Sequence, residues 1–191
     1  KKIQKIKKIK VKNFKKKYYK IPMYTKNLLF EEAKLFCDWY VPMNISKQRV
    51  KLINKKLIKK IKFLLSKLKQ KNDTFVHRDF HVSNLMMFKN RYGVIDTQDA
   101  VVGNKAYDLA SLIDDVRFKT SKKLKKQVFE YYLNINKAEL DLKKFKNDFD
   151  ILSVLRNLKI IGIFTRLAKR DKKYNYLRLI PYTWKLIELR I

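Results

Sequence analysis

The sequence has few of the residues that interrupt helices or form covalent cross-links. Among its 191 residues are three glycines, three prolines and one cysteine, Cys37, which excludes an internal disulfide. No Cys/His cluster has zinc-ligand spacing, and the longest apolar runs, such as residues 160–165, are far shorter than the roughly 18 residues of a membrane span. With 46% hydrophobic residues, we expect one soluble domain in a reducing, cytoplasmic setting.

Acidic residues are also scarce. The 17 Asp and Glu stand against 48 Lys and Arg, which gives a formal net charge of +31. Such an excess can indicate nucleic-acid binding, because cations neutralise phosphates and release counterions. The lysines are spread along the whole chain, however, and the abundant Lys, Ile, Asn, Tyr and Phe share A/T-rich codons, so a genomic base bias explains the same composition. We therefore keep a basic RNA-binding protein only as an alternative, and expect the positive field to attract ATP and anionic substrates.

Apolar residues recur every three or four positions through most of the chain, which predicts helices. The predicted helices cover residues 28–40 with an end near Pro42, 46–70 with Ser46 as N-cap, 105–116, 121–133, 140–168 and 174–190. Gly162 marks either a close approach or a break in the helix over 140–168. Near-helical spacing of Ile3, Ile6, Ile9 and Val11 predicts one more helix, facing the core of a larger body; a basic helix on a membrane surface is the alternative.

Extended structure is predicted only in the middle of the chain. Residues 74–76 read as a short strand, and residues 85–88 and 92–95 flank a turn-rich segment, which predicts a small β-hairpin. Such a hairpin would place Asn84, at the entrance of one strand, beside Asp96, at the exit of its partner.

The most specific pattern is His77-Arg78-Asp79, followed by Asn84 and, after a short apolar strand, Asp96. This order is typical of phosphoryl-transfer enzymes, which need a carboxylate to accept the proton of the attacking hydroxyl and oxygen ligands that hold Mg²⁺ on the nucleotide phosphates. We therefore predict Asp79 as the base, Asn84 and Asp96 as metal ligands, and ATP and Mg²⁺ as cofactors.

Three segments, residues 77–85, 93–100 and 107–112, resemble the aminoglycoside phosphotransferase/choline kinase superfamily. The segment 95–100 and the stretch 156–164 look most like the bacterial N-acetylmuramate/N-acetylglucosamine kinases of cell-wall recycling. The resemblance implies a mainly α fold with a small β-hairpin, the C-terminal helical lobe of a protein-kinase-like fold. Residues 1–191 would form this single lobe, with a catalytic loop at 77–84, a metal-binding segment at 93–99 and a helical subdomain at 105–191.

The resemblance also implies individual roles, with Asp79 as catalytic base and Asn84 and Asp96 as Mg²⁺ ligands. Asp108 would brace the catalytic loop through backbone hydrogen bonds, with simple helix capping as the alternative, and His77 would be a packed scaffold residue. His81 and Asp99 are candidate substrate contacts, although an ordinary loop carboxylate is the alternative for Asp99.

Two residues depart from the family pattern. Arg78 stands where many aminoglycoside kinases carry Gly, which argues against an antibiotic-resistance enzyme. Thr97 occupies a position that is often aromatic. Arg156 receives no role from the sequence.

The acceptor is open at this stage. Glu31, Glu32 and Asp38 could suit a cationic acceptor such as choline or an aminoglycoside, and the aromatic Trp39, Tyr174 and Tyr176 could suit a sugar ring or a quaternary amine. The expectation of a sugar or amino-sugar substrate rests on the resemblance.

Two parts of a complete kinase are not visible: a glycine-containing loop over the phosphates and a strand lysine, because no glycine precedes the catalytic loop. We therefore expect a nucleotide-binding N-terminal lobe to be missing from this chain, and the fragment alone to be inactive. Two interpretations follow: part of an ATP-dependent small-molecule phosphotransferase acting on an alcohol group, or a catalytically retired kinase-like binding module. The intact set of Asp79, Asn84 and Asp96 favours the first.

Overall fold

The computed structural model describes Gln4, residues 8–10 and residues 18–191. Strand β1 (Lys8–Lys10) pairs antiparallel with β2 (Tyr18–Lys20), and Ile9 lies opposite Tyr19 in the ladder. The helix predicted at the start of the chain is therefore wrong for residues 8–10, because pairing with β2 satisfies their backbone groups and suits the β-branched Ile9. Ile3, Ile6 and Val11 lie outside the described residues.

The first helical layer begins at Thr25, whose hydroxyl accepts from the Leu28 N–H at 3.2 Å and caps helix α1 (Lys26–Leu35). The chain continues through a π-helical turn (Phe36–Tyr40) into α2 (Val41–Asn44). The predicted end near Pro42 is two residues too early, because the helix continues past Pro42 to Asn44. The Cys37 carbonyl, one π-helical turn before Pro42, accepts from Asn54 Nδ2 at 3.0 Å in place of the N–H that proline lacks.

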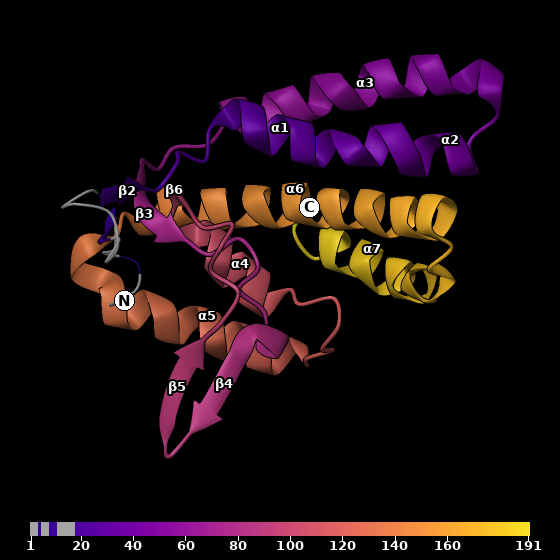
Figure 1. Cartoon of the computed structure of the whole chain (residues 1–191). Coiled ribbons are helices and arrows are strands. Elements are labelled where there is room, and N and C mark those ends of the chain that lie inside the picture. The colour runs from indigo at the N-terminus through magenta and orange to yellow at the C-terminus, as the bar shows by residue number, and fades with distance from the viewer. Residues whose placement is uncertain (1–3, 5–7, 11–17) are drawn as a thin grey trace.

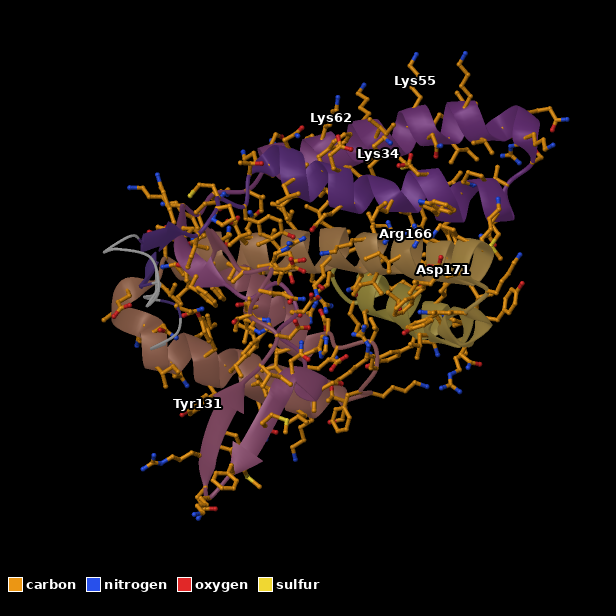
Figure 2. All side chains as sticks on the ribbon, in the orientation of Figure 1. Lys34, Lys55, Lys62, Tyr131, Arg166 and Asp171 are labelled. Atoms are coloured by element: carbon orange, nitrogen blue, oxygen red, sulfur yellow. The ribbon has the colours of Figure 1, made fainter. Side chains whose placement is uncertain are left out.

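Helix α3 (Lys47–Ser66) follows, and it ends four residues before the predicted limit. The N–H groups of Lys69 and Gln70 donate to the buried Asp148 carboxylate at 2.8 and 2.7 Å, in place of helical carbonyls. The outward face of α3 is basic, and Lys55 and Lys62 extend from it into solvent (Figure 2).

The C-terminal half is helical, as predicted. It contains α4 (Ala106–Ile113), α5 (Lys122–Asn136), α6 (Leu142–Asp171) and α7 (Ile180–Glu188), with a 3₁₀ segment (Tyr174–Leu179) before α7. Helix α6 is the axis of the core: α1 and α3 lie on one side of it, and α4 and α5 on the other (Figure 1). The side chains of Ser121 and Asp141 cap α5 and α6.

Gly162, in the middle of α6, is the point of closest approach between α6 and α1. A Cβ atom added there would lie 2.6 Å from the carbonyl oxygen of Leu35. Of the two predicted alternatives, the close approach is confirmed and the break is wrong, because α6 is continuous through this position.

Two small antiparallel sheets carry the loops of interest. Strand β3 (Asn72–Val76) pairs with β6 (Val101–Asn104), a strand that sequence analysis did not predict. The predicted hairpin is confirmed as β4 (Leu85–Phe88) and β5 (Arg91–Val94), which projects away from the helices (Figure 1). Its turn residues Lys89 and Asn90 both have positive φ, 45° and 58°, which matches the type I′ geometry of two-residue hairpins.

The described chain is thus mainly helical with small antiparallel sheets, consistent with part of a kinase-like fold. Among the described residues we find no helix that could span a membrane. Val76, at the end of β3, leads directly into residues 77–84, and β6 leads into α4. The β3–β6 ladder therefore sets the position of the predicted catalytic loop relative to α4.

Candidate active site

A buried carboxylate on α4 holds the start of the loop at residues 77–84. Asp108 Oδ2 accepts from the His77 N–H at 2.7 Å, and Oδ1 accepts from the Arg78 N–H at 3.2 Å. Burial raises the pKa of Asp108 to about 6, although the two N–H groups act to lower it. Both carboxylate oxygens face the loop, so Asp108 connects α4 to the backbone beside Asp79.

His77 connects the same loop to the segment before Asp96. Its side chain is buried, and Nε2 lies 2.8 Å from the carbonyl oxygen of Ile95. Its ring also packs edge-on against Phe80, with ring centroids 5.9 Å apart. These contacts make His77 part of the framework of the site.

Asp79, Asn84 and Asp96 are brought together by short backbone links. The Asn84 Nδ2 donates to the Asp79 carbonyl at 2.9 Å, and the Ile95 N–H donates to the Asn84 carbonyl at 3.1 Å. Asp96 follows Ile95 directly. The catalytic loop and the end of β5 thus bring the backbones of the three predicted residues close together, as the predicted hairpin implies.

The backbone is left-handed at two positions of this site. Arg78 has φ of 71° and Asp96 has φ of 63°, a region that residues other than glycine seldom adopt. Such conformations cost on the order of 1–3 kcal/mol each and persist where surrounding contacts enforce them. Here the Asp108 hydrogen bond to the Arg78 N–H and the His77 contact with the Ile95 carbonyl supply that enforcement, next to Asp79 and Asp96.

The donor set at this place is made of oxygens. Within the described ranges, no group of three or more His, Cys, Asp and Glu side chains could hold a metal ion. The Asn84 amide oxygen and the Asp96 carboxylate are nevertheless hard ligands of the kind that suit Mg²⁺, which commonly takes one or two carboxylates and completes its shell with water and substrate phosphates. The chemistry of these residues therefore fits Mg²⁺.

A buried ion-pair network that sequence analysis did not predict ties the loop to α1 and α6. Glu32 pairs with the Arg78 guanidinium, accepts from the Tyr24 hydroxyl, and lies 3.0 Å from Lys159 Nζ. Burial acts to lower the pKa of Arg78, but the negative charge of Glu32 raises it above its ordinary value. The sequence does contain a signal for this network: Glu32 lies three residues after Leu29 and therefore on the apolar face of α1.

The network corrects one expectation about the acceptor. Glu32 was a candidate for binding a cationic acceptor, but it is only 9% exposed and its charge is already paired. Asp38, another candidate, pairs with Lys34 at 2.7 Å. Asp99 is exposed, and its carbonyl accepts from Arg78 Nη1 at 3.3 Å, so its backbone is part of this network.

A second buried carboxylate holds the far end of the loop. Asp115 Oδ2 accepts from the Val82 N–H at 3.2 Å, and Oδ1 accepts from the Arg117 N–H at 2.9 Å. His81 is 8% exposed, and its Nδ1 has no hydrogen-bond partner among the described residues. Burial, and then the positive charge of Arg117, lower the pKa of His81, which favours the neutral imidazole.

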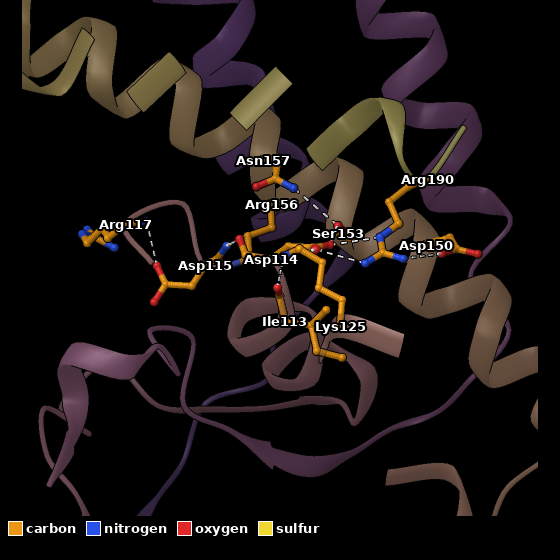
Figure 3. Close-up of polar contacts among 10 residues, drawn as sticks. All are labelled: Ile113, Asp114, Asp115, Arg117, Lys125, Asp150, Ser153, Arg156, Asn157 and Arg190. Atoms are coloured by element: carbon orange, nitrogen blue, oxygen red, sulfur yellow. Dashed lines mark hydrogen bonds and ion pairs between the residues drawn. The ribbon is translucent and has the colours of Figure 1, made fainter. Parts of the chain in front are cut away.

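Asp115 is positioned by its neighbour Asp114, a completely buried residue that is bound by Ser153 and Arg190 (Figure 3). The Asp114 carboxylate accepts from Ser153 Oγ at 2.6 Å and from Arg190 Nε and Nη2, both at 3.0 Å. Arg156 Nη1 donates to the Asp114 carbonyl at 3.4 Å. Arg156, which had no role from the sequence, thus anchors the segment after α4 onto α6.

The framework described above, a carboxylate-braced loop with a clustered Asp, Asn and Asp, defines a phosphotransferase-like site. Comparison with known proteins agrees: residues 25–142 match the model of the phosphotransferase enzyme family, and the chain belongs to this family. The chain is 32% identical to the N-acetylmuramate/N-acetylglucosamine kinase of Neisseria meningitidis over 166 residues, which are 84% of this chain and 50% of that protein.

Two further relatives carry the same name. The protein of Pseudomonas aeruginosa is 33% identical over 180 residues, 90% of this chain and 52% of that protein. The protein of Pseudomonas putida is 30% identical over 166 residues, 84% of this chain and 49% of that protein. The chain therefore spans about half the length of these curated relatives, and the resemblance to sugar kinases stated from the motifs is confirmed.

Proposed function

We propose that this chain is the catalytic part of an ATP-dependent phosphotransferase that acts on a hydroxyl of a sugar or amino sugar, of the N-acetylmuramate or N-acetylglucosamine kind. The observation that carries the proposal is the clustering of Asp79, Asn84 and Asp96 through the Asn84 hydrogen bonds. The names of the relatives support the sugar class.

In this proposal Asp79 accepts the proton of the attacking hydroxyl and orients it toward the γ-phosphorus. Asn84 and Asp96 hold Mg²⁺, which when bound neutralises charge on the nucleotide phosphates. Asp108 and His77 keep the loop rigid, so that the carboxylate of Asp79 is already aimed before the acceptor binds. Asp99 stays a candidate contact for the acceptor, because the hydrogen bond from Arg78 goes to its backbone carbonyl and the residue is exposed.

The nucleotide site would be completed from outside this sequence. We propose that a nucleotide-binding lobe of the same cytoplasmic protein supplies the phosphate-covering loop and lysine, and that the chain alone does not turn over ATP. The β4–β5 hairpin, which connects Asn84 to Asp96, supports this division, because its large apolar side chains Met87, Phe88 and Tyr92 are 69%, 72% and 81% exposed.

The test uses the full-length protein that contains this chain, with Asp79→Asn as the variant. We expect kcat for sugar phosphorylation to fall about 10²–10⁴-fold, because the general base is lost, while the KM for ATP changes little. Asp73→Asn, an exposed aspartate on β3, is the matched control and should keep normal kcat. Normal kcat in the Asp79→Asn variant would make the assigned base wrong. A wild-type protein that binds Mg²⁺-ATP but phosphorylates neither sugar would instead be a retired binding module.

A further inference from the structure

The segment between α4 and α5 contacts the catalytic loop through a buried carboxylate. One carboxylate, that of Asp115, accepts from the Val82 N–H in the loop and from the Arg117 N–H in the segment. Asp115 is 1% exposed, and its neighbour Asp114 is anchored by Ser153 and Arg190, so the arrangement is rigid. The backbone of Arg117 is therefore held beside the catalytic loop.

The loop carries a buried imidazole between the base and Val82: His81 is 8% exposed, and its N–H donates to the Asp79 carbonyl at 3.0 Å. His81 Nδ1 is buried and unpartnered among the described residues, although a buried ring nitrogen normally finds a partner. The charges that act on His81 come from Arg117, Asp115, Arg156 and Asp79. Arg117 has the largest effect among these charges, which places its charge near the His81 ring, in agreement with the Asp115 bridge between the Arg117 N–H and the Val82 N–H.

The other cations around the loop already have partners. Arg78 is paired with Glu32, Arg156 donates to the Asp114 carbonyl, and Arg190 binds the Asp114 carboxylate. Arg117 is exposed, and its guanidinium makes no ion pair or hydrogen bond to any residue of the described ranges. It is an exposed planar donor on the segment that Asp115 joins to the catalytic loop, and it is suited to bidentate binding of a carboxylate.

We propose that Arg117 forms an anion subsite for the acceptor, which binds the carboxylate of an acidic sugar while His81 Nδ1 hydrogen-bonds an uncharged group of the same sugar. The proposal rests on the sugar-kinase function above and deepens it. N-acetylmuramate is N-acetylglucosamine with an added lactyl carboxylate, so a cation at the acceptor side separates these two acceptors by charge alone. Arg117 is then a specificity-determining residue and takes no part in the transfer.

The test compares both sugars as acceptors of the full-length enzyme and its Arg117→Ala variant. A charge-assisted hydrogen-bonded pair stabilises by about 1.5–3 kcal/mol, so we expect kcat/KM for N-acetylmuramate to fall about 10–150-fold. The value for N-acetylglucosamine should stay within about threefold, because that sugar lacks the carboxylate. Arg117→Lys should keep more N-acetylmuramate activity than Arg117→Ala, since lysine retains the positive charge but not the bidentate hydrogen bonding of the guanidinium.

Lys119→Ala is the matched control, because Lys119 is an exposed cation on the same segment that lies over the Tyr182 ring. It should change neither acceptor, and thermal unfolding of all variants checks that each is folded. An equal loss for both sugars in Arg117→Ala, or no loss for either, overturns the anion subsite and leaves the kinase function standing. A wild-type enzyme that accepts only N-acetylglucosamine also overturns the anion subsite and leaves the kinase function standing. A wild-type enzyme that accepts neither sugar overturns both proposals.

Discussion

Asp108 shows how much the site depends on single buried groups. Its carboxylate is the common acceptor for two successive N–H groups of the catalytic loop. Losing it leaves those donors buried without partners, which costs about 1–3 kcal/mol each. The same burial makes Asp108 sensitive to pH.

We expect Asp108 to alter the pH dependence of folding. Burial raises its folded-state pKa from 3.8 to about 6, so the stability that it contributes is present below pH 3.8 and is lost as pH rises through 6. The unfolding free energy of the wild type relative to Asp108→Asn should therefore fall by up to ~3 kcal/mol between pH 4 and pH 7. Urea unfolding of both proteins at several pH values measures this difference, and a difference that is independent of pH would contradict it.

Arg78 and Asp96 illustrate what residue patterns do not reveal. Both residues belong to the predicted catalytic motif, but the motif does not reveal that their backbones have positive φ. That conformation follows from contacts that are distant in sequence, such as Asp108 for Arg78 and the His77 ring for the segment before Asp96.

At the scale of elements, the contact between α1 and α6 links the core to the site. Arg78 in the loop and Lys159 on α6 both pair with Glu32 on α1, so the spacing of the two helices sets the position of that network. Gly162 permits the spacing, because a side chain there would meet the backbone of α1.

Gly162→Ala should therefore destabilise the protein. Alanine favours a helix over glycine by about 1 kcal/mol, but its Cβ would lie 2.6 Å from both the Leu35 carbonyl oxygen and the Phe36 nitrogen. Backbone atoms cannot rotate away, so overpacking wins and we expect a net loss of about 1–3 kcal/mol in urea unfolding. Gly93→Ala is the control, since no atom lies within 4 Å of its added Cβ. Equal stability of the two variants would show that α1 can move at little cost.

At the scale of the whole molecule, charge is the dominant feature. The formal net charge is +31, and Lys55 and Lys59 lie exposed on α3 in a stretch that has no acidic residue between Asp38 and Asp73. Self-repulsion of like charges destabilises a compact state and is screened by salt.

Salt should therefore stabilise this protein. We expect the urea midpoint to rise between about 0.01 and 0.5 M NaCl, as the screening length falls from roughly 30 Å to below 10 Å. The double variant Lys55→Gln/Lys59→Gln is the matched comparison and should show a smaller rise, because it removes two repelling charges from one helix face. A midpoint that does not rise with salt, or an equal rise in both proteins, would contradict this account.

Much of this protein was determined by local sequence. Apolar periodicity determined the order of the helices, the turn at Lys89 and Asn90 determined the hairpin, and the spacing of Asp79, Asn84 and Asp96 indicated a phosphotransferase site, since each depends on residues close together in the chain. Tertiary structure decided the rest. The β3–β6 pairing, the Asp148 contact just after α3, the burial of Glu32 and the Asp115 contact with Val82 all join residues that are far apart in sequence. Short-range patterns carry no signal for such contacts, because they form only when the helices pack around α6.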